Sequence, residues 1–446
     1  CTDLYKDICS VLKIKKHCCI ILLKQNTERS IKMPDSMILY GKYDGYKAIH
    51  SIINDDDNFF DAVFAVSQTA EKYSLSGNVI KAYLALLMMN DENPFSLSCE
   101  KREMQKGGAY SLALSDAEIL RNAYFYDFKN SSHCGTVKKL QDYTCTIYKE
   151  ATADTEIGKM ALSLCKELDK TKSAEDFAAV LAKFYKDFGT GSFGLNKAFV
   201  IKESGDNFTL VPVKKFSDVT LDDLWGYETQ KKQLCDNTEA FVSGKAANNV
   251  LLYGAAGTGK STSIKAVLNE YWSKGLRIID VNKYQFKYLS AVIDSLKDRN
   301  YRFIVYIDDL SFEDFEIEYK YLKSVIEGGI QPKPSNVLIY ATSNRRHLIK
   351  ETWSDRNDTQ ADIHHSDTVQ EKLSLAERFG VAISFMRPIQ KEYQQIVLHL
   401  AKRSGLNIPD DELLDMARVW ELRHGGMSGR IARQFIDSLS NSQGGE

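Results

Sequence analysis

Apolar positions recur at the spacing of an α-helix over the first 190 residues of the chain. Residues 59–73 (FFDAVFAVSQTAEKY) and 174–189 (AEDFAAVLAKFYKDFG) place aromatic and aliphatic side chains three and four positions apart. Such stripes are typical of helices that bury one face. We expect a mostly helical N-terminal domain over residues 1–190, with aromatic side chains that fill a core rather than form a ligand site.

The glycine-rich segment 189–196 (GTGSFGLN) lies where this helical period ends. No apolar strand precedes it and no lysine closes it, so it lacks the pattern of a phosphate-binding loop. Glycine and serine clustered between periodic segments are typical of loops. The segment therefore predicts a linker or a tight turn between two domains.

Short runs rich in Val, Ile and Leu dominate the next part of the chain. Residues 197–213 (KAFVIKESGDNFTLVPV) predict two short strands around a polar turn. Five further runs alternate with helical patterns, which is typical of parallel strands buried on both faces. These runs are 248–254, 276–281, 302–308, 336–343 and 381–386. The pattern predicts an α/β domain with a parallel five-stranded sheet over residues 191–388.

Only helical patterns remain after this region. They occupy residues 391–405, 410–425 and 428–440, and they predict a small helical domain over residues 389–446. We expect three domains in all: a helical one, a sheet domain and a helical C-terminal one.

Composition narrows the functional class only slightly. Of the 446 residues, 43% are apolar and 26% are charged, as in an ordinary globular protein. The formal charge of −2 gives no global attraction to nucleic acid or anionic lipid, so we expect a protein partner and no membrane association. The nine cysteines form no CxxC pair and no zinc-spaced cluster with histidine, which favours reduced thiols and a cytoplasmic location. His364 and His365 are adjacent but lack a third ligand, so we interpret them as solvated.

The segment LLYGAAGTGKST carries the clearest chemical signal. Its spacing fits G-x-x-x-x-G-K-[ST], directly after a predicted strand and before a predicted helix. In such a loop the backbone N–H groups and the helix N-terminus face phosphate oxygens. Lys260 then reaches the β- and γ-phosphates of ATP, and the hydroxyl of Ser261 ligates Mg²⁺, with Thr262 beside it. The predicted nucleotide-binding residues are Gly254, Ala255, Ala256, Gly257, Thr258, Gly259, Lys260, Ser261 and Thr262.

Two aspartates end the strand predicted over residues 302–308. Ligands bind at the carboxyl edge of a parallel sheet, so Asp308 is placed to hold Mg²⁺ opposite Ser261. Asp309 follows it and could orient or deprotonate an attacking water. Glu313 is a rival for that role.

The remaining acids in this stretch fit the start of a helix. Ser311 and Asp314 resemble a capping pair, and Glu313 and Asp314 would lie in the first turn, where negative charge suits the helix dipole. We interpret Asp314 and Glu316 as helix-capping residues. We therefore predict a helix that begins near Ser311 and ends at Gly328 and Gly329.

The order of these motifs resembles that of the AAA+ ATPases over about residues 216–446. Two segments, 307–349 and 428–439, are more similar still to an uncharacterised bacterial family, domain of unknown function 815. Residues 93–120 are similar to that family less sharply. The resemblance implies a P-loop ATPase fold with a helical lid and the use of ATP and Mg²⁺.

The resemblance also implies roles for single residues. Lys260 and Ser261 resemble the Walker A pair and Asp308 the Walker B aspartate. Asn344 resembles the sensor-1 residue that polarises the attacking water, or is a turn residue at a strand end. Arg378 resembles an arginine finger, or is a surface arginine.

Sensor 2 has two candidates in the C-terminal helices. Arg430 resembles the sensor-2 arginine that reaches the γ-phosphate, with Arg433 as its rival and a salt bridge within the lid as the alternative.

Two departures from the AAA+ pattern affect the expected activity. The second acid is Asp309 where that superfamily usually has Glu, which puts the hydrolysis rate in doubt more than binding. Residues 280–300 run from a strand almost directly into a helix, without a pore loop, which argues against a threading unfoldase. We expect a self-associating ATPase that hydrolyses ATP slowly to remodel or load a macromolecular partner; the alternative is a nucleotide-gated switch or scaffold with little turnover.

Overall fold

The computed structural model describes residues 33, 35–101, 107–145, 153–205, 207–312, 318–327, 333–345, 375 and 377–443. Within these ranges the chain divides into two compact units, Cys1–Leu195 and Asn196–Glu446. The segment predicted as a linker instead contains the short helix α10, and the division falls at its end. In the described part of the chain, no helix is long and apolar enough to cross a membrane.

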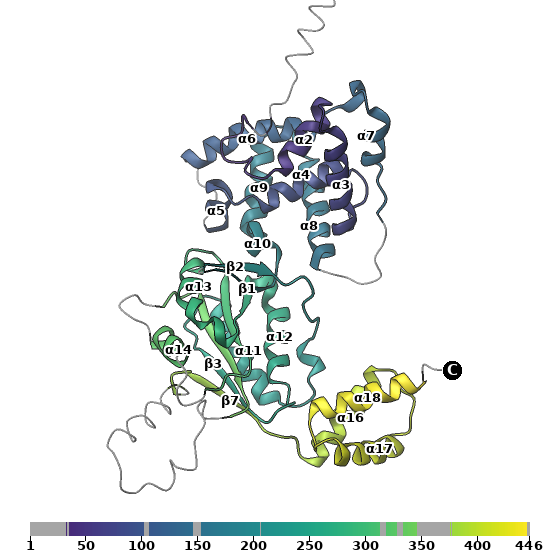
Figure 1. Cartoon of the computed structure of the whole chain (residues 1–446), viewed down its shortest axis with the longest axis vertical. Coiled ribbons are helices and arrows are strands. Elements are labelled where there is room, and N and C mark those ends of the chain that lie inside the picture. The colour runs from purple at the N-terminus through teal and green to yellow at the C-terminus, as the bar shows by residue number, and fades with distance from the viewer. Residues whose placement is uncertain are drawn as a thin grey trace, which may run out of the picture. The chain divides into compact units, whose positions relative to one another are not determined.

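The first unit consists of helices around one core, which confirms the helical prediction (Figure 1). The two segments predicted from their stripes become α3 and α9 almost residue for residue. The bounds of its α-helices are α2 Gly45–Asn54, α3 Phe59–Tyr73, α4 Val79–Asn90, α5 Pro94–Lys101, α6 Gly108–Tyr124, α7 Cys134–Gln141, α8 Ala153–Leu168, α9 Ala174–Phe188 and α10 Gly191–Leu195. The helix α4 is buried along most of its length and packs against α2, α3, α7 and α8, so it forms the centre of this unit.

A buried carboxylate ties the start of the described chain to this core. Asp116 on α6 is fully buried and accepts hydrogen bonds from the backbone N–H groups of residues 38, 39 and 40 at 2.7, 2.6 and 3.0 Å. Three backbone donors satisfy the charge that burial would otherwise penalise. The carboxylate therefore orders residues that belong to no helix.

The second unit is built on one sheet with strand order β2-β1-β4-β5-β6-β3-β7. All five strands predicted for the parallel sheet are present: β3 Val250–Gly254, β4 Leu276–Asp280, β5 Arg302–Ile307, β6 Val337–Ser343 and β7 Val381–Phe385. They pair in parallel, and β6 is buried at each of its seven positions. The continuous apolar runs thus mark the parallel strands, but β7 lies at an edge of the sheet and is only partly buried, so the expectation of burial on both faces is wrong for it.

The predicted strand count of five is wrong, because the sheet has seven strands. The two strands predicted over residues 197–213 form β1 Ala198–Ser204 and β2 Asn207–Pro212, an antiparallel pair. β1 also pairs in parallel with β4 and buries Ala198, Phe199 and Ile201. The hairpin therefore covers an edge of the sheet whose backbone groups would otherwise lack partners.

Helices and short 3₁₀ turns connect the strands. Their bounds are η2 Leu221–Asp223, α11 Glu228–Val242, α12 Lys260–Tyr271, η3 Trp272–Lys274, η4 Lys283–Tyr288, α13 Leu289–Leu296 and α14 Glu318–Glu327. After β4 the chain enters η4 and α13 with two residues between, as the sequence predicted. The helix predicted to begin near Ser311 is described only from Glu318 onward, so Glu313, Asp314, Glu316, Gly328 and Gly329 lie outside the described residues.

The three predicted C-terminal helices are confirmed as α16 Gln390–Arg403, α17 Asp410–Arg423 and α18 Gly429–Gln443 (Figure 1). They share a core of Tyr393, Val397, Leu413, Ala432, Phe435 and Ile436. We call these three helices the lid. The histidines His364 and His365 lie outside the described residues.

Candidate functional site

The glycine loop after β3 has the backbone that its sequence predicted. Gly254 ends β3 with φ 134°, and a Cβ there would lie 2.1 Å from the carbonyl oxygen of Phe385 on β7. The N–H of Ala255 donates to that same carbonyl at 3.1 Å. Only glycine allows the chain to leave β3 in this direction while it stays against β7.

Lys260 points back into this loop from the first position of α12. Its ammonium donates to the carbonyls of Gly254 and Ala255 at 2.9 and 2.7 Å, and to Oδ1 of Asn344 at 3.1 Å. Burial lowers the pKa of Lys260, although the carboxylates of Asp309 and Asp308 oppose that shift. The ammonium is thus held at the mouth of the loop by neutral oxygens and nearby negative charge.

Asp308 lies at the end of β5, beside the loop. Its Oδ1 accepts hydrogen bonds from Oγ of Ser261 at 2.7 Å and from Oγ1 of Thr342 at 2.6 Å. Burial alone would raise the pKa of Asp308, but these hydrogen bonds outweigh it and hold the pKa below its ordinary value. An ionised carboxylate beside a hydroxyl supplies the oxygen ligands that Mg²⁺ prefers, so Asp308 and Ser261 fit a magnesium site.

Asp309 adopts a backbone conformation that is rare for a residue with a side chain. Its φ is 50°, and its N–H donates to Oγ1 of Thr342 at 2.9 Å. Its carboxylate accepts from Nδ2 of Asn344 at 2.7 Å. Such left-handed residues persist where the surroundings hold them, and they cluster at functional sites. The amide of Asn344 consequently links Lys260 to Asp309.

Thr342 is a site residue that the sequence analysis missed. It precedes Asn344 by two positions on β6, and its hydroxyl contacts both acids, through the side chain of Asp308 and the backbone of Asp309. A hydroxyl at the carboxyl end of an otherwise buried apolar strand was the available signal.

The lid closes one side of the site. The backbone N–H of Arg430, near the start of α18, donates to the carbonyl of Gly257 at 3.2 Å. A Cβ on Gly257, whose φ is 76°, would lie 3.0 Å from Oγ of Ser428. Arg403 on α16 pairs with Asp223 at 2.5 Å, so a second contact holds the lid to the sheet domain.

These elements enclose a cavity of about 580 Å³. One part of its lining is polar and contains Gly257, Thr258, Gly259, Lys260, Ser261, Thr262, Asp308, Asp309, Asn344, Arg430 and Arg433. The other part is apolar and aromatic, with Val219, Leu224, Trp225, Tyr227, Ile396 and Leu400. A charged end and an apolar end match the two ends of a nucleotide, and both sensor-2 candidates line the wall.

Arg378 does not line this cavity. It lies three residues before β7, pairs with Glu327 of α14 at 2.6 Å and lines a different cavity. The five residues of β7 separate it from the carboxyl edge of the sheet, and at about 3.3 Å per residue they span roughly 16 Å. Within one chain, therefore, Arg378 lies at the edge opposite the glycine loop.

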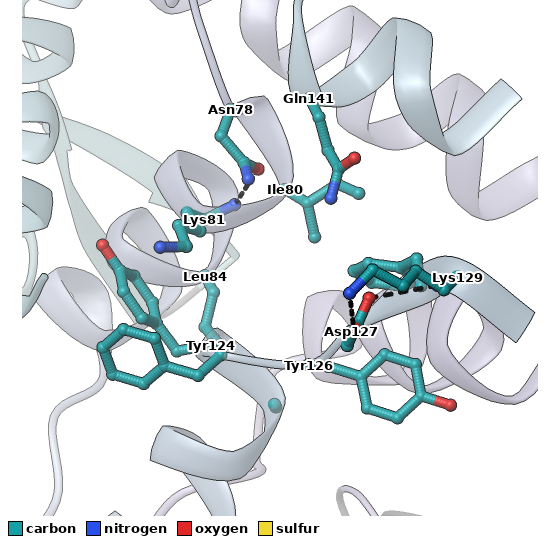
Figure 2. A pocket seen from close by; sticks show the side chains of 12 residues that line it. Asn78, Ile80, Lys81, Leu84, Tyr124, Tyr126, Asp127, Lys129 and Gln141 are labelled. Atoms are coloured by element: carbon teal, nitrogen blue, oxygen red, sulfur yellow. Dashed lines mark hydrogen bonds and ion pairs between the residues drawn. The ribbon is translucent and has the colours of Figure 1, made fainter. Parts of the chain in front are cut away.

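A cavity in the first unit has different chemistry (Figure 2). Its volume is about 290 Å³, and the charged side chains on its wall are already paired. Lys81 contacts Asp169 at 2.6 Å, and Lys129 contacts Asp127 at 2.9 Å. Asn78 accepts from the backbone N–H of Lys81, which caps α4. Because its charged side chains are paired with opposite charges, this cavity gives no comparable indication of a charged ligand.

Three comparisons relate the chain to known proteins. Residues 195–443 match the family described as "Protein of unknown function (DUF815)". A stretch of 59 residues is 37% identical to replication factor C large subunit of Methanococcus vannielii, and it covers 13% of this chain. That stretch is 12% of the length of the curated relative.

Two solved structures are similar over half of the chain. The Holliday junction branch migration motor RuvB of Thermotoga maritima is 19% identical with a TM-score of 0.35, covering 50% of this chain and 64% of that one. Another structure of the motor is 19% identical with a TM-score of 0.36, covering 50% and 65%. The chain thus spans less than two thirds of the length of the motor.

The close approach at Gly254 predicts a large effect of substitution there. Gly254→Ala forces a methyl group against the backbone of β7, so we expect it to lower the denaturant midpoint of unfolding of the second unit. Gly275→Ala is the matched control, since Gly275 also has a positive φ, 87°, but its Cβ would meet nothing within 4 Å. The control carries only the cost of the left-handed backbone, about 1–2 kcal/mol. Equal losses in the two variants would contradict the packing role of Gly254.

Proposed function

Because the chain belongs to the DUF815 family of proteins of unknown function and has an AAA+ P-loop ATPase fold, we propose that it binds ATP with Mg²⁺ and hydrolyses it slowly. One observation carries the proposal: the hydrogen-bonded series from Lys260 through Asn344 to Asp309. These residues come from three separate segments and meet at one edge of the sheet. Their order, cation then amide then carboxylate, is what phosphate binding and activation of a water require.

The phosphates of ATP would lie along the glycine loop, with the adenine ring against Trp225 and Tyr227. Lys260 would exchange a carbonyl partner for phosphate oxygens, which suits a cation held by weak neutral acceptors. Mg²⁺, when bound by Ser261 and Asp308, would neutralise charge on the phosphates. Arg430 or Arg433 would bring the lid to the same phosphates.

Asp309 would accept the proton of the attacking water, with Asn344 orienting that water. The left-handed backbone of Asp309 sets the direction in which its short carboxylate leaves the chain. One of its oxygens already accepts from Asn344. Both features support slow turnover, and they also favour the second candidate, a nucleotide-gated switch with little hydrolysis.

We further propose that the first unit engages a macromolecular partner, and that protein is the better candidate. The helix α3 exposes Phe60 and Phe64, one turn apart, at 64% and 69%. Adjacent exposed aromatic side chains favour a protein surface over a phosphate backbone. Nucleic acid remains the competing class, because the curated relative is named as a replication factor. Two results together would decide for nucleic acid. DNA would bind in a salt-sensitive way in a mobility-shift assay, and a variant that binds ATP without hydrolysing it would recover no protein partner.

Substitutions of the two acids at the end of β5 are predicted to have different effects. Asp309→Asn should bind ATP·Mg²⁺ normally yet release phosphate at least about a hundredfold more slowly, because the water loses its acceptor. Asp308→Asn should mainly weaken Mg²⁺-dependent binding. Both are checked by nucleotide titration and single-turnover phosphate release.

Comparing Glu313→Gln with Asp309→Asn identifies the general base that accepts the proton of the water. If Glu313→Gln stops turnover while Asp309→Asn leaves it intact, then Asp309 is not the base. If both variants hydrolyse ATP normally, neither Asp309 nor Glu313 is the general base, and this part of the proposal is wrong.

The position of Arg378 predicts that hydrolysis needs a second copy of the chain. An arginine supplied in trans is worth about 10³ to 10⁵ in rate. Specific activity should rise with protein concentration, and Arg378→Ala should bind ATP but hardly hydrolyse it. Mixing Arg378→Ala with Lys260→Ala should restore part of the activity, because one mixed interface holds an intact site. Specific activity that stays flat on dilution, with Arg378→Ala unimpaired, would contradict self-association.

A further inference from the structure

A second cavity of the sheet domain lies at the amino-terminal edge of the sheet, opposite the glycine loop. Its volume is about 450 Å³. The first residues of several strands or the residues just before them form its wall, including Asn249 before β3, Arg302 at the start of β5 and Gly380 before β7. Segments far apart in the sequence therefore meet here only because the strands are parallel and adjacent.

The ionisable side chains that line this cavity are all cations: Lys245, Arg302, Lys333 and Arg378. Among the described lining residues there is no Asp or Glu. Like charges gathered in a partly enclosed space repel one another, and a bound anion relieves that repulsion. In the first unit Lys81 and Lys129 have carboxylate partners, whereas here Arg378 pairs with Glu327 of α14 at 2.6 Å but Lys333 donates to a neutral amide.

Lys333 and Arg302 are half-buried, whereas Lys245 and Arg378 are exposed. The ammonium of Lys333 donates to Oδ1 of Asn249, which also accepts from the N–H of Ile339 at 2.9 Å. The partner of this ammonium is thus a neutral amide that already has another donor. Burial lowers the pKa of Lys333 to about 8. An anion bound beside the ammonium of Lys333 would supply the negative charge that the neutral amide of Asn249 lacks.

Arg302 is held with its guanidinium in the same wall. One of its nitrogens donates to the carbonyl of Ser335 at 3.2 Å, and the group lies against the ring of Phe241 at 5.7 Å. A Cβ on Gly244 would come within 3.1 Å of this guanidinium, so glycine leaves room for it. The guanidinium keeps further N–H donors for a ligand, since a carbonyl and a ring face use only part of its capacity.

We propose that this cavity binds a phosphate group, with Lys333 and Arg302 as its main contacts and Lys245 and Arg378 completing the charge. Arginine and lysine together are the common donors to phosphate oxygens. The phosphate has two sources: a free phosphorylated ligand, or the nucleotide carried by a second copy of the chain. The first source needs no ATPase activity, whereas the second rests on the proposed function.

The first experiment tests the free ligand. Sulfate and inorganic pyrophosphate are titrated into the Lys260→Ala variant of the whole chain described here, in which the glycine loop lacks its lysine. We expect saturable binding that Lys333→Met in this background weakens by about tenfold, the worth of one charge-assisted hydrogen bond. Lys333→Arg should retain it. The matched control is Lys391→Met, an exposed lysine of the lid, which should change nothing.

The second experiment tests the second copy. Nucleotide-dependent self-association of the otherwise unaltered chain is followed by sedimentation velocity, with Lys333→Met and Lys391→Met compared at equal nucleotide occupancy. If the phosphate comes from a neighbour, Lys333→Met should weaken association by about tenfold while its own site still binds nucleotide. Failure of nucleotide binding itself would count against the proposed function, whereas the sulfate result would stand independently.

A pH series adds a readout that misfolding would not mimic. Sulfate keeps its charge between about pH 7 and about pH 9, so a change in its affinity reports on the protein. The other charged side chains that line the cavity are Lys245, Arg302 and Arg378, and Glu327 of α14 pairs with Arg378. Affinity should be highest below the pKa of Lys333 and fall as the pH rises through it, because the ammonium loses its proton. Lys333→Arg should flatten this profile. The proposal is overturned if Lys333→Met changes neither anion binding nor self-association.

Discussion

The parallel pairing of β5 and β3 with the strand between them, β6, is the constraint on which the rest of the second unit depends. Ile307 pairs with Ala341, and Tyr253 pairs with Ser343, so three strands end at nearly the same level. Residues that follow those positions must then meet at one edge. The glycine loop, the two acids and Asn344 come together for this reason, and a shift of one residue in either register would separate them.

Hydrogen bonds then fix what the register brings together. Thr342 donates to the side chain of Asp308 and accepts from the backbone of Asp309, so one hydroxyl sets the position of both acids. Asn344 can satisfy Lys260 and Asp309 at once only in one orientation of its amide. The sheet side of the site is thus held by side-chain hydrogen bonds, and the lid meets it through Gly257 and Asp223.

The same sheet creates two edges with different chemistry. Charged groups at the carboxyl edge are of both signs, whereas the charged side chains that line the cavity at the amino edge are cations. Among these, Lys333 and Arg302 have neutral partners, and Arg378 pairs with Glu327 of α14. If a neighbour presents its nucleotide to the amino edge, one chain supplies a complete binding site and an incomplete catalytic one. Self-association would then be part of the chemistry rather than an addition to it.

Much of the second unit could be predicted from sequence because its signals are local. The glycine loop, the five parallel strands and the lid helices each have a pattern within a few residues. The pairing of β1 with β4, the left-handed backbone of Asp309 and the role of Thr342 could not be predicted, because each depends on a partner at another position. The cationic cavity was the hardest feature to predict, because its four cations lie far apart in the sequence, at positions 245, 302, 333 and 378. Glu313 lies outside the described residues, so the choice between Glu313 and Asp309 as the acceptor of the water's proton is made by the variants above.

The central claim is that the loop around Lys260 holds the phosphates of ATP, and titration of ATP·Mg²⁺ into the folded chain tests it most directly. Lys260→Ala should lose about tenfold to a hundredfold in affinity, the worth of a hydrogen bond from a charged donor, while its unfolding midpoint stays the same. Lys274→Ala, which removes an exposed lysine paired with Glu239 just beyond α12, should bind like the unaltered chain. Undiminished affinity in folded Lys260→Ala would contradict the account.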